Sequence, residues 1–477
     1  MKETLYESPF SSRYASKEMS HLFSAEYKFL TWRKLWVALA KGQKALGLNI
    51  SDEQIASLEK QIANIDFEAA KEHEKNLRHD VMAHVHAFGD SAPLAKGIIH
   101  LGATSAFVTD NTDLIVMKNA LSLLQAKTIQ VLKQLADFSL KYKDLACLSY
   151  THFQAAQPTT VGKRGALWLQ DFLLDAKDIE EGSKKIRFLG LKGATGTQAS
   201  FLNLFDGDSQ KVKELENFVA KKMGFSAFFL ISSQTYTRKQ DVQILSLLNG
   251  LAVSSHKFGS DLRLLAHLKE LEEPFNTKQV GSSAMPYKRN PVRAERICGL
   301  ARFLISLCEN PSYTAATQWL ERTLDDSSNR RLTLPEAFLC ADSILNLLID
   351  VTSHMIVYPK MIERHLKEEL PFMATENILM EAVKQGKDRQ AIHERLRLLT
   401  QEESCLMKEE GKGSTLLEKL ANDPLIGLGK EKIERLAKAE NFTGRSEAQV
   451  LEFLKEELTP FLQKHKDLKP PIHPIEL

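Results

Sequence analysis

The sequence contains few helix-breaking residues, with only 23 glycines and 15 prolines among 477 positions. Globular proteins usually contain about 12% of these two residues together, so their scarcity here argues against a turn-rich, strand-rich fold. The five cysteines are scattered and form no C-x-x-C pair, which argues against a disulfide framework and a structural zinc site. We therefore expect a reducing, cytoplasmic location.

The chain also lacks a large charge of one sign and a long apolar run. Its formal net charge is +2, whereas a nucleic-acid-coating protein or a binder of anionic membranes normally has a larger basic excess. The N-terminal residues contain no apolar signal-peptide region, and we identify no apolar stretch of the ~20 residues that span a bilayer. We expect neither a nucleic-acid partner nor a membrane partner.

What the sequence does contain is long helical periodicity. From Leu114 to Tyr142, apolar residues recur at alternating spacings of three and four, which predicts a helix of about 29 residues, or roughly 43 Å. Similar patterns predict further long helices over residues 159–189, 239–271, 291–308 and 335–359. In the last two, Pro291 and Pro335 are expected in the first helical turn.

Helices of this length cannot bury their apolar faces inside one small domain. We therefore expect an all-α fold with a long central bundle that is extended by oligomerisation. The predicted domains are an N-terminal helical domain (1–104), the central long-helix bundle (105–357) and a C-terminal helical domain (358–477). Within the first domain, Ser51 and the acidic and amide residues after it predict the start of a short helix that reaches Ile65.

The most informative segment is G-S-S-A-M-P-Y-K-R-N-P at residues 281–291, between two predicted helices. It contains two hydroxyls, two cations and an amide, a composition suited to closing over an anionic ligand. For an arbitrary loop of this composition, a solvated connection between helices is the alternative, and Ser282 and Ser283 would then only form turns.

Two other patterns suggest sites that we do not favour. His79, Asp80, His84 and His86 are candidate metal ligands, but His84 and His86 diverge around a helix and no H-E-x-x-H spacing exists. The G-x-x-G-x-x-G pattern at residues 190–196 has neither the Walker lysine nor a preceding strand. We expect no metal site, and a turn between helices at the glycines.

The loop at residues 281–291 resembles the signature G-S-S-x-M-P-x-K-x-N-P of the fumarase/aspartase superfamily at every fixed position. Its tyrosine and second cation make it more similar to the adenylosuccinate lyase family than to the fumarase or argininosuccinate lyase families. The other matching segments are S-R-Y (12–14), R-H-D-V-M-A-H (78–84), G-A-T-S (102–105), T-H-F-Q (151–154), K-G-A-T-G-T-Q (192–198) and E-R-T-L-D-D-S (321–327). One departure is Ala155, where the family commonly has proline; this loosens the turn but removes no functional group.

The resemblance implies a homotetrameric C–N lyase with active sites shared between subunits and no cofactor. Its substrates would be succinyl nucleotides: adenylosuccinate, which gives AMP, and SAICAR, which gives AICAR, each with release of fumarate. This β-elimination requires a base for a C–H proton, an acid for the departing nitrogen and cations for the carboxylates. The alternatives are an argininosuccinate lyase-type elimination and a catalytically inactive structural relative.

The motif positions imply a role for each site residue. Ser282 matches the family's general base, and His152 matches its general acid, since imidazole titrates near neutrality. Lys288 would supply positive charge beside Ser282, and His79 would contact the phosphate or tune His152. Lys288 and His79 also count among the implied substrate contacts, together with Arg13, Tyr14, Arg78, Asp80, Thr104, Ser105, Gln234, Asn290, Arg296, Arg322, Ser327 and Arg331. Taken singly, several of these arginines would be interpreted as parts of solvated helix faces.

Overall fold

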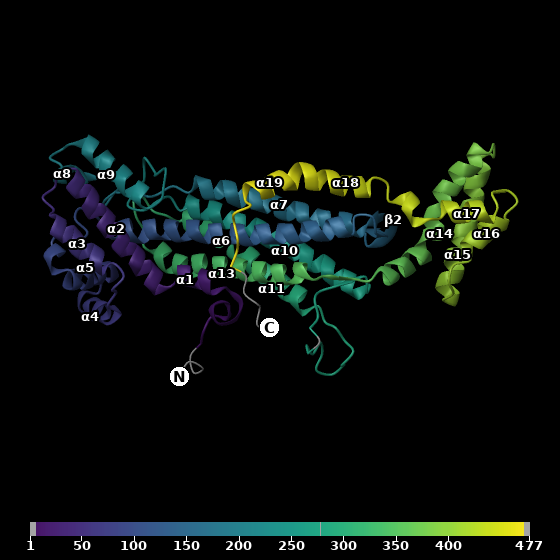
Figure 1. Ribbon diagram of the computed structural model, residues 1–477, viewed down its shortest axis with the longest axis horizontal. Helices are drawn as coiled ribbons and strands as arrows, with labels where there is room; N and C mark the ends of the chain where they lie inside the picture. Colours follow the sequence, from purple (N-terminus) through teal and green to yellow (C-terminus); the bar gives the residue numbers. More distant parts are fainter. Residues whose placement is uncertain (1–5, 277, 472–477) are drawn as a thin grey trace.

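The computed structural model describes residues 6–276 and 278–471, and the molecule is elongated (Figure 1). Its centre is a bundle of long helices that run along the long axis and pack side by side. They are α6 (Ser105–Lys141), α7 (Val161–Lys185), α10 (Lys239–His267), α11 (Val292–Leu307) and α13 (Asp325–Ser353). The predicted all-α class and the five long helices are therefore confirmed.

The periodicity in the first long segment corresponds to the buried face of α6. Leu114, Leu121, Leu124 and Leu135 are all fully buried, and the helix packs against α7 and α13. It spans 37 residues, or about 55 Å, which is longer than predicted because it begins at Ser105. The apolar seam does not reveal this start, since the polar residues 109–113 separate it from the apolar first turn of α6.

The predicted start of α13 at Pro335 is wrong, because the helix begins ten residues earlier and contains this proline in its interior. An interior proline lacks one backbone hydrogen bond. Here the early turns are held by buried ion pairs to the start of α10: Arg238 with Asp326, and Arg330 with Asp241. These tertiary contacts outweigh the local preference of proline.

A short β-hairpin interrupts the helical chain where we predicted no strand. β1 (Ala146–Thr151) and β2 (Gln154–Thr160) pair antiparallel, and β3 (Leu271–Glu272) pairs with β4 (Ile356–Val357). The β1–β2 turn consists of His152 and Phe153, with φ of 53° and 57°. Positive φ at both positions matches the twist of a two-residue hairpin. The hairpin places His152 at an exposed tip beyond the bundle.

Smaller helices gather at the two ends of the bundle. At one end lie α1 (Lys17–Leu22), α2 (Ala25–Ala45), α3 (Asp52–Gln61), α4 (Phe67–Leu77), α5 (Asp80–Ser91), α8 (Ala199–Leu204) and α9 (Ser209–Lys222). Ser51 forms a capping box with Gln54, which confirms the predicted start of α3, although this helix ends at Gln61. The short helix α12 (Asn310–Ala316) packs against α10 and α13.

The C-terminal part contributes to two cores. α14 (Pro359–Lys384), α15 (Arg389–Glu410), α16 (Leu416–Asn422) and α17 (Lys430–Leu436) surround a separate apolar cluster. α18 (Ser446–Phe453) then returns to pack on α7, followed by α19 (Thr459–Lys464). The predicted domain limits stay a prediction, but α6 and α14 begin within two residues of them.

Among the described residues, α13 alone is long and apolar enough to cross a membrane by length and composition. Our expectation that no apolar stretch reaches this length did not take this helix into account. In the structure, 78% of the apolar 18-residue stretch of this helix is buried, as is typical of a core helix.

One buried and one half-buried histidine predict a loss of stability in mild acid. Burial, together with Arg33 and Lys28, lowers the pKa of His84 to about 4, and burial lowers the pKa of His100 to about 4. Between pH 6.5 and 4 these rings bind protons only in the unfolded chain, so each should lower the unfolding free energy by up to ~1.4 kcal/mol per pH unit of acidification. Denaturant unfolding at several pH values should show a shallower decline for His84→Phe, and parallel curves would contradict this expectation.

Candidate active site

Segments far apart in the sequence line a cavity of about 1050 Å³ at the end of the bundle that carries α4 and α5. This volume is at the upper end of ordinary ligand pockets and is large enough for a nucleotide. Nine of the predicted substrate contacts line it: Arg78, His79, Asp80, Thr104, Ser105, Gln234, Arg322, Ser327 and Arg331. The fold thus brings three of the matching motifs together.

Helix termini position the histidine of the R-H-D motif in this cavity. His79 is the N-cap of α5, and its Nδ1 accepts a hydrogen bond from the Met82 N–H at 3.4 Å. The other ring nitrogen, Nε2, lies 3.5 Å from Ser105 Oγ. The next residue, Asp80, pairs with Arg331 Nη2 at 3.3 Å across 251 positions of sequence. This arrangement leaves an imidazole and a guanidinium at the cavity wall.

Gln234 links one further motif to the cavity and contacts one that already lines it. Its Nε2 donates to Ala194 O at 3.1 Å, and its backbone N–H donates to Glu321 O at 3.3 Å. The first contact lies in the glycine-rich segment between α7 and α8, which confirms that this segment is a turn between helices near the site. The second contact ties Gln234 to the E-R-T-L-D-D-S segment that carries Arg322 and Ser327.

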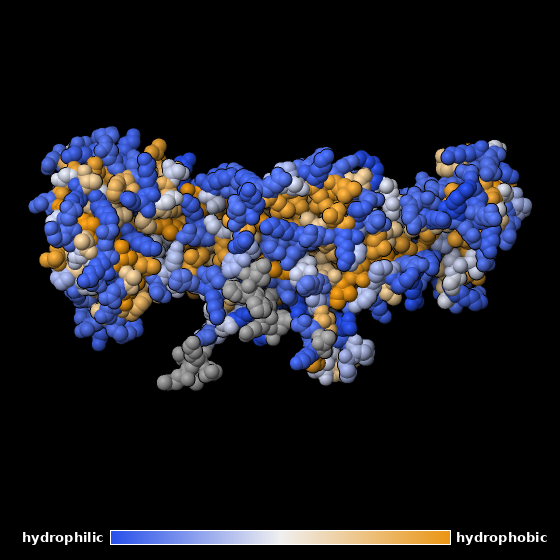
Figure 2. Space-filling view, in the orientation of Figure 1, coloured by the Kyte–Doolittle hydropathy of each residue, from blue (hydrophilic) through white to orange (hydrophobic). Residues whose placement is uncertain are grey.

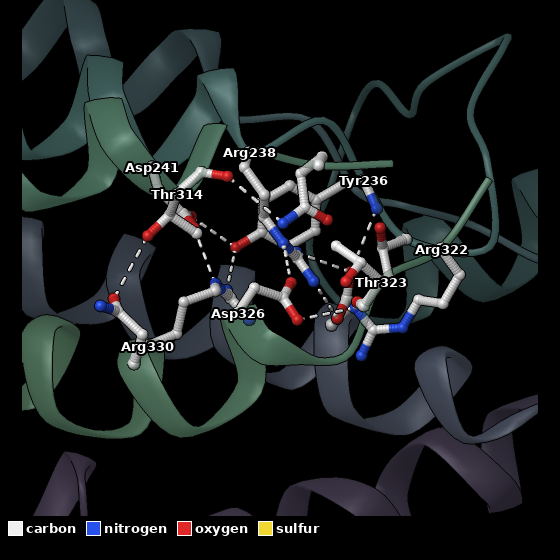
Figure 3. A network of polar contacts seen from close by, with 12 residues as sticks. Tyr236, Arg238, Asp241, Thr314, Arg322, Thr323, Asp326 and Arg330 are labelled. Carbon is white, nitrogen blue, oxygen red and sulfur yellow. Dashed lines mark hydrogen bonds and ion pairs between the residues drawn. The ribbon is translucent and has the colours of Figure 1, made fainter. Parts of the chain in front are cut away.

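Beneath the cavity lies a buried ionic network that the sequence analysis missed (Figure 3). Arg238 donates to Asp326 Oδ2 from Nε at 2.7 Å and to Asp110 Oδ2 from Nη1 at 2.9 Å. Arg330 Nε donates to Asp241 Oδ2 at 2.7 Å. Burial alone would lower the pKa of Arg238, but the carboxylates, led by Asp110, raise it above its ordinary value. Most of the sequence neighbours of these charged residues are polar as well, so no local pattern marks the charges as buried.

The network also fixes one group that faces the cavity, and a half-buried lysine lies near it. Arg322 Nη1 donates to Asp326 Oδ1 at 2.7 Å, so a predicted substrate contact is positioned by a buried carboxylate. Lys28, another residue that the sequence analysis missed, lines the cavity with its ammonium 4.9 Å from the Trp32 ring. Burial lowers the pKa of Lys28, and Asp113 partly offsets this effect.

The other predicted site residues lie outside this cavity, in three places. The first place combines Arg13 and Tyr14 with Arg296. The Arg13 and Arg296 guanidinium carbons lie 5.9 and 5.5 Å from the centre of the Tyr14 ring. Tyr14 ends the π-helical turn η2 (Phe10–Tyr14), which packs on α13, and Arg296 belongs to α11. The structure therefore brings the S-R-Y motif together with Arg296, which belongs to none of the matching motifs.

The second place is the signature loop between α10 and α11, which carries Ser282, Lys288 and Asn290. Ser282 Oγ accepts hydrogen bonds from the N–H groups of Ala284, at 3.4 Å, and Met285, at 3.1 Å. A Cβ atom on Gly281 would lie 2.1 Å from Lys288 O. Only glycine permits this approach, which brings the backbone of Lys288 beside that of Ser282.

The third place is the tip of the β1–β2 hairpin, where His152 is exposed. The proline expected after it is absent, yet Ala155 remains paired with Tyr150 in the hairpin ladder. The turn is therefore held by backbone pairing.

Helix lengths show how far these places lie from the cavity. The base of the signature loop is tied to the end of α13 by Arg293, whose Nε lies 2.5 Å from Asp350 Oδ2. Asp326, beneath the cavity, precedes Asp350 by 24 helical residues, or about 36 Å. The hairpin follows the far end of α6, about 55 Å from Ser105. A single chain therefore keeps its cavity apart from its own Ser282 and His152.

Over the described ranges 6–276 and 278–471, no group of three or more His, Cys, Asp or Glu side chains is arranged to hold a metal ion. His79, Asp80, His84 and His86 thus form no such group.

Comparison with known proteins gives both the fold and the family. Residues 36–304 match the family model described as lyase, and residues 371–453 match the one described as adenylosuccinate lyase C-terminus. Among solved structures, 3-carboxy-cis,cis-muconate lactonizing enzyme from Pseudomonas putida is similar in fold, with a TM-score of 0.82 at 23% identity over 96% of this chain and 99% of that chain.

Relatives in sequence are similar over almost their whole length. Adenylosuccinate lyase of Schizosaccharomyces pombe is 49% identical over 97% of both chains, and that of Saccharomyces cerevisiae is 49% identical over 96% of both. Adenylosuccinate lyase of Schistosoma mansoni is 46% identical over 97% of both chains. The chain therefore belongs to the adenylosuccinate lyase family and has the all-α fold of the fumarase/aspartase superfamily.

Proposed function

We propose that this protein is an adenylosuccinate lyase, a C–N lyase that releases fumarate from adenylosuccinate and from SAICAR. The observation that carries the proposal is the meeting of nine predicted substrate contacts in one cavity of nucleotide size, in a chain whose relatives have this activity by name. Guanidinium groups suit the phosphate and the carboxylates, because both accept paired hydrogen bonds.

In this proposal Ser282 first loses its hydroxyl proton to solvent. The resulting alkoxide takes the proton from the carbon next to a carboxylate and becomes a hydroxyl again. The Ser282 oxygen already accepts two backbone N–H groups, which stabilise negative charge as the hydroxyl becomes an alkoxide. Lys288 supplies positive charge to the alkoxide and to the doubly charged carboxylate form. His152 gives a proton to the departing nitrogen, after which the C–N bond breaks and fumarate leaves.

We also propose a homotetramer in which each site combines residues of several subunits. One chain keeps its cavity tens of ångströms from its own Ser282 and His152, and two different neighbouring chains supply these residues to it. Apolar side chains also reach the surface along the long helices (Figure 2). Leu167 and Leu174 on α7 and Val253 and Leu264 on α10 are exposed, as expected for the core of a larger bundle.

The proposal includes a cytoplasmic location, which the thiol chemistry supports. All five cysteines are free, and burial raises the pKa of the Cys147 thiol to about 11. Such thiols persist in a reducing compartment.

A turnover assay tests the activity. The purified enzyme is incubated separately with adenylosuccinate, SAICAR and argininosuccinate, and fumarate is followed by ultraviolet absorbance and chromatography. We expect fumarate from the two succinyl nucleotides and none from argininosuccinate. Turnover of argininosuccinate alone would establish the first alternative, and no turnover of any substrate by a correctly assembled protein would establish an inactive relative.

Lys288 gives a prediction about the kind of charge that the site requires. Lys288→Met should lower kcat by about 10²-fold or more, since an electrostatic contact to the transition state is lost. Lys288→Arg should also be poor, because a planar guanidinium does not replace a compact ammonium. Steady-state kinetics of both variants decides this, and near-normal activity of Lys288→Arg would show that positive charge of any shape suffices.

A further inference from the structure

A buried polar cluster outside the cavity connects α6 and α13. The side chains of Lys127 and Asp342 are fully buried and form an ion pair. Lys127 Nζ also donates to Asn346 Oδ1 at 2.7 Å. A buried ion pair is often no more stabilising than apolar residues of similar size. Packing of the two helices therefore does not explain why charged groups occupy these positions.

The remaining polar atoms of the cluster bind the backbone of the N-terminal segment. Asp342 Oδ2 accepts the N–H of Ser16 at 2.6 Å, and Asn346 Nδ2 donates to the carbonyl of Tyr14 at 3.3 Å. Ser16 is buried and is the N-cap of α1, with its Oγ accepting from the Met19 N–H. The chain is thus held on both sides of residue 15.

The segment that this cluster holds carries two proposed ligand-binding residues. Arg13 and Tyr14 belong to the turn η2, and Arg13 is exposed. The Tyr14 ring is the common neighbour of the Arg13 and Arg296 guanidinium groups. A shift of the Tyr14 backbone would therefore move one cation directly and the other through the ring.

We propose that Lys127, Asp342 and Asn346 are positioning residues for substrate binding. They fix the backbone of residues 14–16, so that Arg13 and Tyr14 meet an anionic group of the succinyl nucleotide in a single geometry. The inference rests on the proposed function, which supplies this ligand. The cluster itself does not touch the substrate and acts only through the segment it holds.

The first test is Asn346→Leu, a change of similar size that keeps the side chains of Lys127 and Asp342. It removes the bond to Tyr14 together with the bonds of Asn346 to Lys127 and Asp342. We expect the KM for adenylosuccinate to rise about tenfold while kcat stays within about twofold, because binding geometry changes and the chemistry does not. Should Asn346→Leu fail to fold, Asn346→Asp replaces it, since it retains an acceptor for Lys127 and lacks the donor for Tyr14. A fall in kcat at unchanged KM would overturn the proposal.

Thr352→Val is the matched control. Thr352 Oγ1 donates to Gln134 Oε1 at 2.8 Å, so this change also breaks a polar contact between α13 and α6 but leaves the N-terminal segment untouched. Its KM should stay at the wild-type value. An equal rise of KM in both variants would mean that general loosening of the two helices is responsible, which would overturn the proposal.

A double-mutant cycle tests the route of the effect. If the cluster acts through the S-R-Y segment, Asn346→Leu should add little to the KM of Arg13→Ala, because the cation that it positions is already absent. Full additivity of the two changes would indicate independent sites and would overturn the proposal.

Proteolysis in the absence of substrate tests this inference independently of the proposed function. Trypsin cleavage after Arg13, followed by mass spectrometry, should be faster in Asn346→Leu than in the wild type and unchanged in Thr352→Val. Equal cleavage in all three proteins would overturn the inference even if the enzyme is active. Absence of adenylosuccinate turnover by the wild type, with faster cleavage in Asn346→Leu, would instead refute the proposed function and retain the positioning of the segment.

Discussion

Ser282→Ala should lower kcat for adenylosuccinate by about a thousandfold and leave KM nearly unchanged. Loss of a general base typically removes 10²–10⁴-fold of rate, and a group that acts only in the transition state affects kcat rather than ground-state binding. Steady-state and single-turnover kinetics of the purified variant measure both constants.

Ser283→Ala is the matched control for this prediction. Ser283 is exposed and follows Ser282 directly in the same loop, so its replacement removes the same chemical group without touching the two N–H contacts of Ser282. It should retain most of the activity. Equal losses in the two variants would assign the effect to the loop as a whole, and a Ser282→Ala effect confined to KM would refute the role as base.

Mixing two inactive variants, His79→Ala and Ser282→Ala, should restore about a quarter of the wild-type activity. The two residues lie at opposite ends of α13 in one chain, so a shared site takes His79 from one subunit and Ser282 from another. With random reassembly of equal amounts, each position is wild type with probability ½, and both together with about ¼. Activity after dissociation and reassembly measures the recovered fraction.

The structure offers a control for this experiment within the signature loop. Ser282 and Lys288 lie on the same loop of the same chain, so any site receives both from one subunit. Mixtures of Ser282→Ala with Lys288→Met should therefore stay inactive. If the His79→Ala and Ser282→Ala mixture also stays inactive, while mass spectrometry shows subunit exchange and light scattering shows tetramers, the shared-site arrangement is refuted.

The helices that could be predicted are those whose signal is local. The seam from Leu114 to Tyr142 records which face of α6 is buried, and this pattern does not depend on the partner helix. Pro335 shows where such reasoning fails. Its local preference is to begin a helix, but Arg238 and Arg330, more than eighty residues apart, hold the preceding turns in helical form. No window of sequence around the proline contains that information.

The residues of the candidate site also fall into two groups, those that a short motif identifies and those that no local pattern identifies. Ser282, Lys288 and His152 could be chosen because short motifs carry them. Arg238, Asp110 and Lys28 belong to no motif that we recognised, and each is notable only because the fold buries a charge beside the cavity. The hairpin at His152 was missed for a related reason, since its two positive-φ residues are not the glycine or asparagine that normally mark such turns.

The sequence by itself determined the class of fold, the family resemblance and the residue types needed for the chemistry, because periodicity and motifs are properties of neighbouring residues. Only the tertiary structure decided which of these residues meet. It placed nine in one cavity, joined Arg296 to Tyr14 and put Ser282 and His152 at the opposite end of the bundle. The physical reason is that rigid helices of 29 and 37 residues convert positions along the chain into fixed separations of tens of ångströms. A single chain cannot close these separations, whereas packing several such bundles together can.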